Sequence, residues 1–193
     1  GVTHLTPVTQ SPLYSGRLAF AAIGKEPGYF GSSTYYGGQD VLAFGVGAQV
    51  QKDGSRFAGT PAVGAVPAVP PGAANYSEVN ADVLAEFKLG ESGSLTGEGA
   101  FYHYSGDFNP ADNQFFLVAS YLSPAVGPGK LQPLVRYQMA KKKDVDAMSK
   151  VDVQLAYAVK GASMRGLIGF SHTDLGKDVQ GNAIQLGLQT IMF

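Results

Sequence analysis

The sequence predicts an all-β protein, a transmembrane antiparallel up-and-down β-barrel, and three observations indicate it. Charged residues make up only 15% of the 193 residues, against roughly 25% in a typical soluble domain. No apolar run approaches the ~20 residues of a membrane-spanning helix. Apolar and polar residues alternate along most of the chain, which is the period of a β-strand with two different faces. Composition alone leaves either an apolar soluble β-protein or a barrel whose polar half faces inward.

The alternation places nine strands along the chain. In residues 76–89, for example, Val79 and Val83 share one face, and Glu78 and Asp82 share the other. The predicted strands span residues 15–25, 39–52, 76–89, 94–104, 114–123, 130–140, 149–160, 163–173 and 182–193. Strands of soluble proteins average nearer 5–6 residues, whereas tilted membrane strands need ~9–11. The length of these strands therefore favours the membrane barrel.

The connections between the predicted strands also differ in length. Outer-membrane barrels have short periplasmic turns and longer external loops. If the C-terminus is periplasmic, the longer and more polar connections are external. These connections are residues 53–75, 105–113, 141–148 and 174–181. The asymmetry is what a barrel of this kind predicts.

Aromatic residues gather near the predicted strand ends, as in the two girdles of a membrane barrel. At the periplasmic end we place Tyr14, Tyr29, Phe30, Tyr35, Tyr36, Phe87, Tyr121 and Phe193. At the outer end we place Tyr76, Phe101, Tyr102, Tyr104, Phe108, Phe115 and Phe116. Aromatic residues are also common in soluble strands, so their clustering is not decisive by itself.

Several segments of the chain resemble outer-membrane porins of the phosphate-selective porin family. They are "YSGRLAF", "KEPGYFGSSTYYGGQDVLAFGVGAQVQKDG", "GKLQPLVRYQ" and the ending "IQLGLQTIMF". The resemblance rests on strand and turn residues spread over most of the chain. It implies a water-filled barrel in the outer membrane of a Gram-negative bacterium, passing small hydrophilic solutes or ions passively, often with a preference for anions. It also implies that the terminal Phe193 is the signal recognised by the barrel-insertion machinery.

We expect one barrel domain over residues 1–193 that forms the C-terminal part of a larger porin. Porins of this family are longer, and single-chain bacterial barrels have even numbers of strands. Either "GVTHLTPVTQ" supplies a tenth strand, or a missing N-terminal half or a partner completes the barrel, because unpaired edges are not tolerated in lipid. Trimers are common in this class, so a homotrimer is a further expectation. Membrane lipids and lipopolysaccharide are the other expected partners, and a net charge of -1 gives no reason to expect nucleic acid.

The alternation also identifies the residues predicted to line the lumen. The acidic set is Glu78, Asp82, Glu86 and Glu98. The basic set is Lys130, Arg136, Lys150, Lys160 and Arg165. Because the two sets occur on different strands, they would occupy different sectors of the wall and create a field that filters solutes by charge. The alternative is that salt bridges neutralise both sets and leave no selectivity.

Three consecutive lysines, Lys141, Lys142 and Lys143, fall in a predicted external loop. At the mouth of a channel they would attract anions. A short lysine run is equally consistent with a solvated loop or with a contact to anionic lipid head groups.

We expect a channel rather than an enzyme, with one catalytic alternative. His103 and Ser105 lie at i, i+2 on one strand face, where they could form the dyad of an outer-membrane acyl hydrolase. The chain has three histidines without metal-ligand spacing and no cysteine, so neither a metal nor a cofactor is expected. A third class of function is a structural or partner-binding barrel whose pore is plugged.

Two positions should interrupt the regular strands. Pro133 lacks a backbone donor, and we expect it to mark a bulge or a strand start. Near Thr190 the alternation slips, since Ile191 and Phe193 fall on the opposite face from Leu188. We expect a bulge there, or a last strand that ends one pair early.

Overall fold

One antiparallel β-sheet makes up the protein. The computed structural model describes residues 11–25, 35–57, 59, 71–107, 109, 111–159, 164–176 and 179–190. The strands are β1 (Leu13–Ile23), β2 (Val41–Phe57), β3 (Gly72–Lys88), β4 (Ser94–Ser105), β5 (Asn113–Leu122), β6 (Ala125–Val126), β7 (Gly129–Lys141), β8 (Met148–Ala158), β9 (Met164–Asp174) and β10 (Gln180–Thr190). A single 3-10 turn, η1 (Gly90–Ser92), joins β3 to β4. No helix of the described part is long and apolar enough to cross a membrane.

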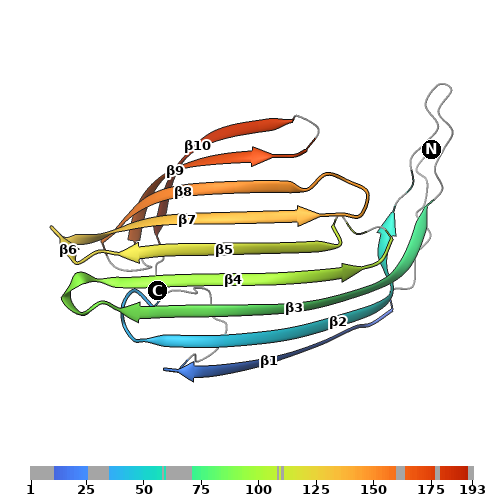
Figure 1. Cartoon of the computed structure of the whole chain (residues 1–193), viewed down its shortest axis with the longest axis horizontal. Helices are drawn as coiled ribbons and strands as arrows, with labels where there is room; N and C mark the ends of the chain where they lie inside the picture. Colours follow the sequence, from blue (N-terminus) through green and yellow to red (C-terminus); the bar gives the residue numbers. More distant parts are fainter. Residues whose placement is uncertain are drawn as a thin grey trace.

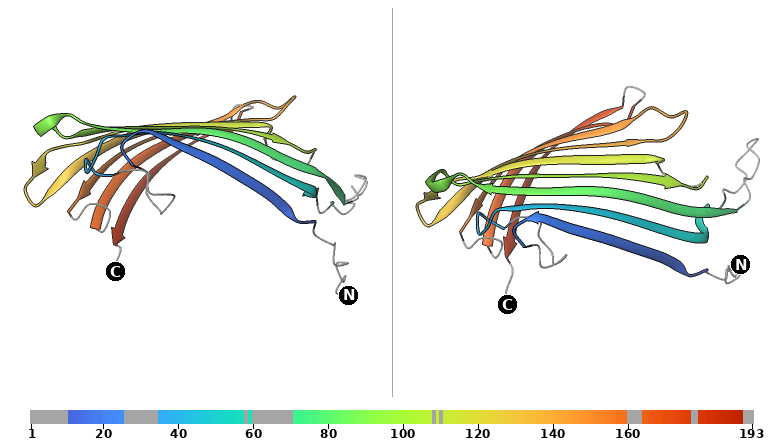
Figure 2. Two further views of the ribbon diagram at one scale, coloured as in Figure 1. Left: turned by 90° about the horizontal axis from the view of Figure 1, so that it is seen from below. Right: turned by 60° about the horizontal axis from the view of Figure 1, so that its bottom comes forward.

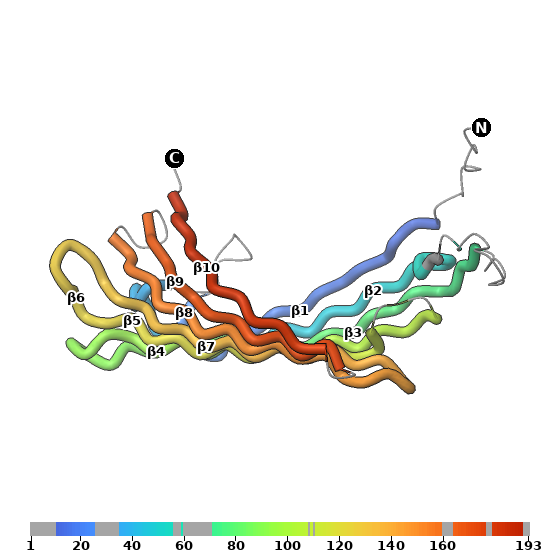
Figure 3. The backbone as a smooth tube through the Cα atoms, turned by 90° about the horizontal axis from the view of Figure 1, so that it is seen from above, coloured from blue at the N-terminus to red at the C-terminus, as the bar shows by residue number. Residues whose placement is uncertain are grey.

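The strands lie side by side in chain order, each antiparallel to the next, and the two-residue β6 pairs only with β7 (Figure 1). The sheet is curved, and its two edges, β1 and β10, bend toward the same side (Figures 2 and 3). Among the described residues β1 pairs only with β2, and β10 only with β9. The prediction of an all-β antiparallel up-and-down fold is confirmed. Over the described residues the sheet is an open trough, a shape compatible with part of a barrel wall.

Each of the nine predicted strands corresponds to one long strand. The largest difference is in residues 53–75, predicted as a loop, into which β2 and β3 both extend. The pairing of β2 with β3 is irregular between Gln51 and Ser55, and Asp53 has a positive φ of 54°. An irregularity of this kind interrupts the alternation of apolar and polar residues, which is why the strand predicted from the sequence ends at residue 52 although β2 continues beyond it.

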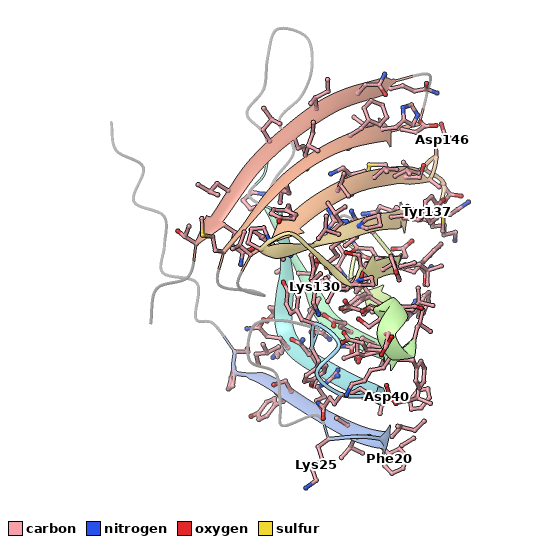
Figure 4. The ribbon with its side chains drawn as sticks, turned by 90° about the vertical axis from the view of Figure 1, so that its left-hand side faces the viewer. Phe20, Lys25, Asp40, Lys130, Tyr137 and Asp146 are labelled. Carbon is pink, nitrogen blue, oxygen red and sulfur yellow. The ribbon has the colours of Figure 1, made fainter. Side chains whose placement is uncertain are left out.

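On the two faces of this sheet, several charged side chains are buried and many apolar side chains are exposed, which is the reverse of the pattern in a soluble protein. Glu86 and Asp152 are 0% exposed, whereas Leu117 is 57% and Ile168 53% exposed. Leu117 and Ile168 lie on β5 and β9, which have neighbours on both sides, so their exposure is due to the face and not to an edge. In Figure 4 the polar Lys130 lies on the concave side, with Phe20 and Tyr137 on the convex side. The concave face is polar and the convex face apolar.

Neither predicted interruption is a bulge within the described residues. The β7–β8 ladder runs without a shift through Pro133↔Leu155, while the β5–β7 ladder ends at Ser120↔Leu134. Pro133 therefore lies where pairing with β5 stops, and the expectation of a bulge or strand start is wrong. The β9–β10 ladder is regular to its last pair, Thr190↔Met164, and Ile191 and Phe193 lie outside the described residues.

Several aromatic residues lie elsewhere than in the two predicted girdles. Tyr14 pairs with Val50, near the 53–75 connection, so it lies at the end opposite to η1 and its predicted placement is wrong. Four aromatics predicted for the outer girdle belong to the concave polar face instead, because the register aligns them with polar residues there. They are Tyr76, Tyr102, Tyr104 and Phe116. Parity places Phe101 and Phe115 on the convex face, where they pair with each other; Tyr29, Phe30 and Phe108 lie outside the described residues.

Candidate functional site

The candidate site is the concave polar face, where strand register aligns side chains in rows. One row crosses the sheet through Leu84, Glu98, Val118, Arg136, Asp152 and Ser171. The same parity places every described member of the predicted lumen sets on this face, and Lys160 lies outside the described residues. The acidic set lies on β3 and β4 and the basic set on β7, β8 and β9. These described side chains therefore share one face of the sheet and lie in two separate sectors of it.

Asp82 of the acidic sector is paired with Arg17, a residue that the sequence interpretation did not select. The guanidinium donates two hydrogen bonds, from Nη1 to Oδ2 at 2.5 Å and from Nη2 to Oδ1 at 2.8 Å. Arg17 lies on β1 and Asp82 on β3, so the ion pair passes over β2. It passes over Gly45, where a Cβ atom would lie 2.1 Å from Nη2 of Arg17. The glycine provides the space that the ion pair occupies.

Glu78 is held by its own strand. The Tyr76 hydroxyl donates to Oε2 at 2.6 Å, and Asn80 Nδ2 donates to Oε1 at 2.8 Å. The side chain is only 8% exposed. On β4 the rings of Tyr102 and Tyr104 are stacked, with centroids 6.2 Å apart and planes 8° from parallel. Both carboxylate oxygens of Glu78 thus accept hydrogen bonds from neighbouring side chains of the protein.

Glu86 is the most deeply buried carboxylate of the acidic sector. It accepts hydrogen bonds from the backbone N–H groups of Tyr35 (2.9 Å) and Gly37 (2.7 Å) and from the hydroxyl of Thr96 (3.0 Å). Two of the three donors belong to the connection between β1 and β2. A carboxylate satisfied by backbone donors in this way anchors a loop, and its charge is not presented to solvent.

The basic sector is organised around one buried acid, Asp152 on β8. Arg136 on β7 places Nε and Nη2 each 3.0 Å from Oδ2, and Lys150 Nζ lies 3.0 Å from Oδ1. Gln138 donates a further, longer bond of 3.3 Å to Oδ2. Arg136 and Lys150 have side chains 39% and 33% exposed. Two cations therefore share a single carboxylate and both face the concave space.

Arg165 and Lys130 extend the basic sector to the end that carries η1. Arg165 Nε donates to Gln189 Oε1 at 2.7 Å, and its Nη1 donates to the hydroxyl of Tyr36 at 3.4 Å. Tyr36 and Lys130 line a common hollow of about 310 Å³. Lys130 has no ion-pair partner in the described part of the chain. Tyr36 thus lies beside both Arg165 and Lys130, at the same end of the sheet as η1.

The lysine run is partly engaged in loop contacts. Lys142 Nζ donates to the carbonyl oxygen of Asn109 at 2.5 Å, and the backbone N–H of Lys143 donates to Asp112 Oδ2 at 2.6 Å. Lys141 and Lys143 are exposed. Of the three predicted mouth lysines, Lys142 holds two neighbouring connections together, and the other two face solvent.

His103 and Ser105 lie on the convex face, as their spacing predicts, but they do not contact each other through a hydrogen bond in the described structure. His103 Nδ1 is bonded to Asn113 Oδ1 across the strand pair at 2.9 Å. The pair His172 and Asn182 repeats this contact at 2.8 Å on β9 and β10. The described residues contain no group of three or more His, Asp or Glu that could hold a metal ion.

Two residues of the site were missed by the sequence interpretation. Arg17 could have been found, because the alternation of "YSGRLAF" places it on the polar face of a predicted strand. Tyr36 could not, because no periodic pattern links a loop residue to β9. Comparison of the chain with protein-family models, with curated proteins and with solved structures found no match.

Proposed function

We propose that this chain forms the wall of a transmembrane β-barrel, an outer-membrane porin that passes small hydrophilic solutes or ions by passive diffusion, with a preference for anions. The observation that carries the proposal is the inverted burial of the two faces. Charged groups such as Glu86 and Asp152 are covered, while apolar side chains of central strands are exposed. Lipid is the environment in which such an apolar face is stable.

Strand length supports the same proposal. The nine long strands have 10–17 residues, and a tilted strand needs ~9–11 to cross the hydrocarbon core. In water, an apolar face running over nine strands would instead promote association. The resemblance to phosphate-selective porins is consistent with the proposal and stays a hypothesis.

The open edges of the sheet require further strands in this setting. Backbone N–H and C=O groups cannot remain unpaired in hydrocarbon, so β1 and β10 must each pair with a strand from outside the described sheet. We propose that these strands come from another part of a larger barrel, to which the described sheet contributes part of the wall.

The proposed preference for anions rests on a difference in exposure: the acidic side chains are hydrogen-bonded within the protein, whereas two basic side chains stay partly exposed. The carboxylates of Glu78, Asp82 and Glu86 are each occupied by at least two donors of the protein. Arg136 and Lys150, by contrast, share one acid and stay partly exposed. A dissolved anion can therefore approach exposed cations, whereas a cation meets few exposed carboxylates.

The test is planar-bilayer recording with the purified full chain. We expect steady conductance, with a reversal potential in a salt gradient displaced toward the anion equilibrium potential. The double variant Arg136→Gln/Lys150→Gln should reduce that displacement. A sealed, silent membrane would contradict the channel. Conductance without displacement would contradict only the anion preference.

A further inference from the structure

Residues 35–38, which we call the strap, belong to the described part of the connection between β1 and β2 and are hydrogen-bonded to side chains of the concave face. Gly38 N donates to Tyr35 O at 2.9 Å, and φ is positive at both residues between them, 53° at Tyr36 and 73° at Gly37. This is the pattern of a type I′ turn, in which both central residues have positive φ. Asparagine or glycine is usual at the first of these positions, and a bulky residue there is strained. Tyrosine at this position indicates that its side chain has a role.

The first end of the strap is fixed to β3. Both oxygens of Glu86 accept strap N–H groups, at 2.9 Å from Tyr35 and 2.7 Å from Gly37. Tyr35 also packs against the small buried cluster formed by Val41, Ala43 and Leu84. The strap is therefore attached to the acidic sector by hydrogen bonds to a fully buried carboxylate and by apolar packing.

The second end reaches β9 on the far side of the trough. The Tyr36 hydroxyl accepts a hydrogen bond from Arg165 Nη1 at 3.4 Å. Between β3 and β9 lie five strand-to-strand steps, which at ~4.8 Å each amount to roughly 24 Å along the sheet. The strap as a whole therefore contacts both sectors, through the N–H groups of Tyr35 and Gly37 on one side and the Tyr36 hydroxyl on the other. The sheet curves between these two sectors (Figure 2). The phenol also lines the hollow next to Lys130.

We propose that the strap is a fixed crosspiece that limits the size of solutes using the concave face, and that Tyr36 is its specificity-determining residue. This inference rests on the proposed channel function. A solute moving along the polar face toward the η1 end has to pass beside the Tyr36 ring, within reach of Lys130 and Arg165. Glu86 is a positioning residue, since it acts on the solute only through the strap.

The variant Tyr36→Gly tests the proposal. Glycine adopts positive φ without strain, so the turn and its bonds to Glu86 should persist while the ring is lost. In planar bilayers we expect conductance to rise about twofold, because the narrowest section limits flow, and larger neutral polyethylene glycols to enter the channel. Asp144→Gly is the matched control, since Asp144 also has a positive φ (61°) and lies in the β7–β8 connection. It should leave the size limit unchanged.

The outcomes separate this proposal from the channel itself. Conductance in the wild type with the same size limit in Tyr36→Gly would overturn the crosspiece and leave the channel intact. Silence in both proteins would overturn the channel and the crosspiece together. A wild type that is silent and a Tyr36→Gly variant that conducts would overturn the size limit, because Tyr36 would then block the channel completely. Glu86→Gln should change the size limit in the same direction by less, because the amide keeps one acceptor for the two strap N–H groups.

Discussion

The acidic strands β3 and β4 and the basic strands β7 to β9 carry charges of opposite sign and use them differently. On β3, each of Glu78, Asp82 and Glu86 is engaged by neighbouring donors. On the basic side, a single buried acid, Asp152, holds both Arg136 and Lys150. The carboxylates of β3 thus hold the structure of the concave face together, while Arg136 and Lys150 of the other sector remain partly exposed on it. Counting charges on a polar face therefore says less about selectivity than the hydrogen bonds that occupy them.

Among these variants, Glu86→Ala should have the largest effect, a loss of stability caused by removing a carboxylate of the acidic sector. It leaves two backbone donors of the strap and the Thr96 hydroxyl without their buried acceptor, which should lower the free energy of unfolding by about 3 kcal/mol. Urea unfolding of the protein in lipid vesicles measures this loss. Glu91→Ala, at an exposed carboxylate of η1, is the control and should change stability little. Equal effects of the two variants would show that Glu86 is not an anchor.

Filling the space above β2 should have a smaller effect. In Gly45→Val the new side chain would occupy the position of the Arg17 guanidinium and separate it from Asp82. The ion pair is partly exposed, so its loss should cost only about 1 kcal/mol. Gly97→Val is the matched control, because a Cβ at Gly97 meets no atom within 4 Å. If both variants unfold at the same urea concentration, the glycine is not needed for the pair.

Replacing Asp152 by the neutral asparagine should change the permeability ratio of anions to cations while the sheet stays folded. In Asp152→Asn, Arg136 and Lys150 keep a hydrogen-bond acceptor but lose the charge that they share. We expect the permeability ratio of anions to cations to rise about twofold, since the local field becomes more positive. The reversal potential in a salt gradient measures the ratio. A shift toward cations would contradict the role assigned to this sector.

The smallest effect is expected at the convex-face pair of His103 and Ser105. His103 Nδ1 is hydrogen-bonded to Asn113 Oδ1, and the described residues show no hydrogen bond between Ser105 and the imidazole that would act as its general base. Ser105→Ala should leave the release of fatty acid from a short-chain ester substrate at the level of the wild type. Loss of a measurable hydrolysis in this variant would restore the catalytic alternative.

Strand positions and the two faces could be predicted because each depends on neighbours in the sequence. Alternation over β3 and over β8 is enough to place Glu86 and Asp152 on the polar face. The pairing of β3 with β4 and of β7 with β8 follows from short connections between consecutive strands. Thus the polar face could be listed almost completely from the sequence alone, and Arg17 could have been added by the same rule.

The remaining features depend on contacts that sequence distance conceals. The bond between Tyr36 and Arg165 spans 129 positions and exists only because the sheet curves. The irregularity near Asp53 interrupts the alternation without a proline to announce it. The position of Tyr102 near a strand end favours an interfacial girdle, whereas the parity of β4 places it on the polar face. Curvature and register, rather than residue type, decide these cases.

The direction of the two edge strands restricts how the trough can be closed. With nine long strands alternating in direction, β1 and β10 run the same way across the sheet. Joining them to each other would create a seam of parallel strands in a sheet that is otherwise antiparallel. A second copy inserted in the same orientation would create two such seams. A fully antiparallel ring requires an intervening set with an odd number of strands, so any strands that closed this sheet into such a ring would have to be odd in number.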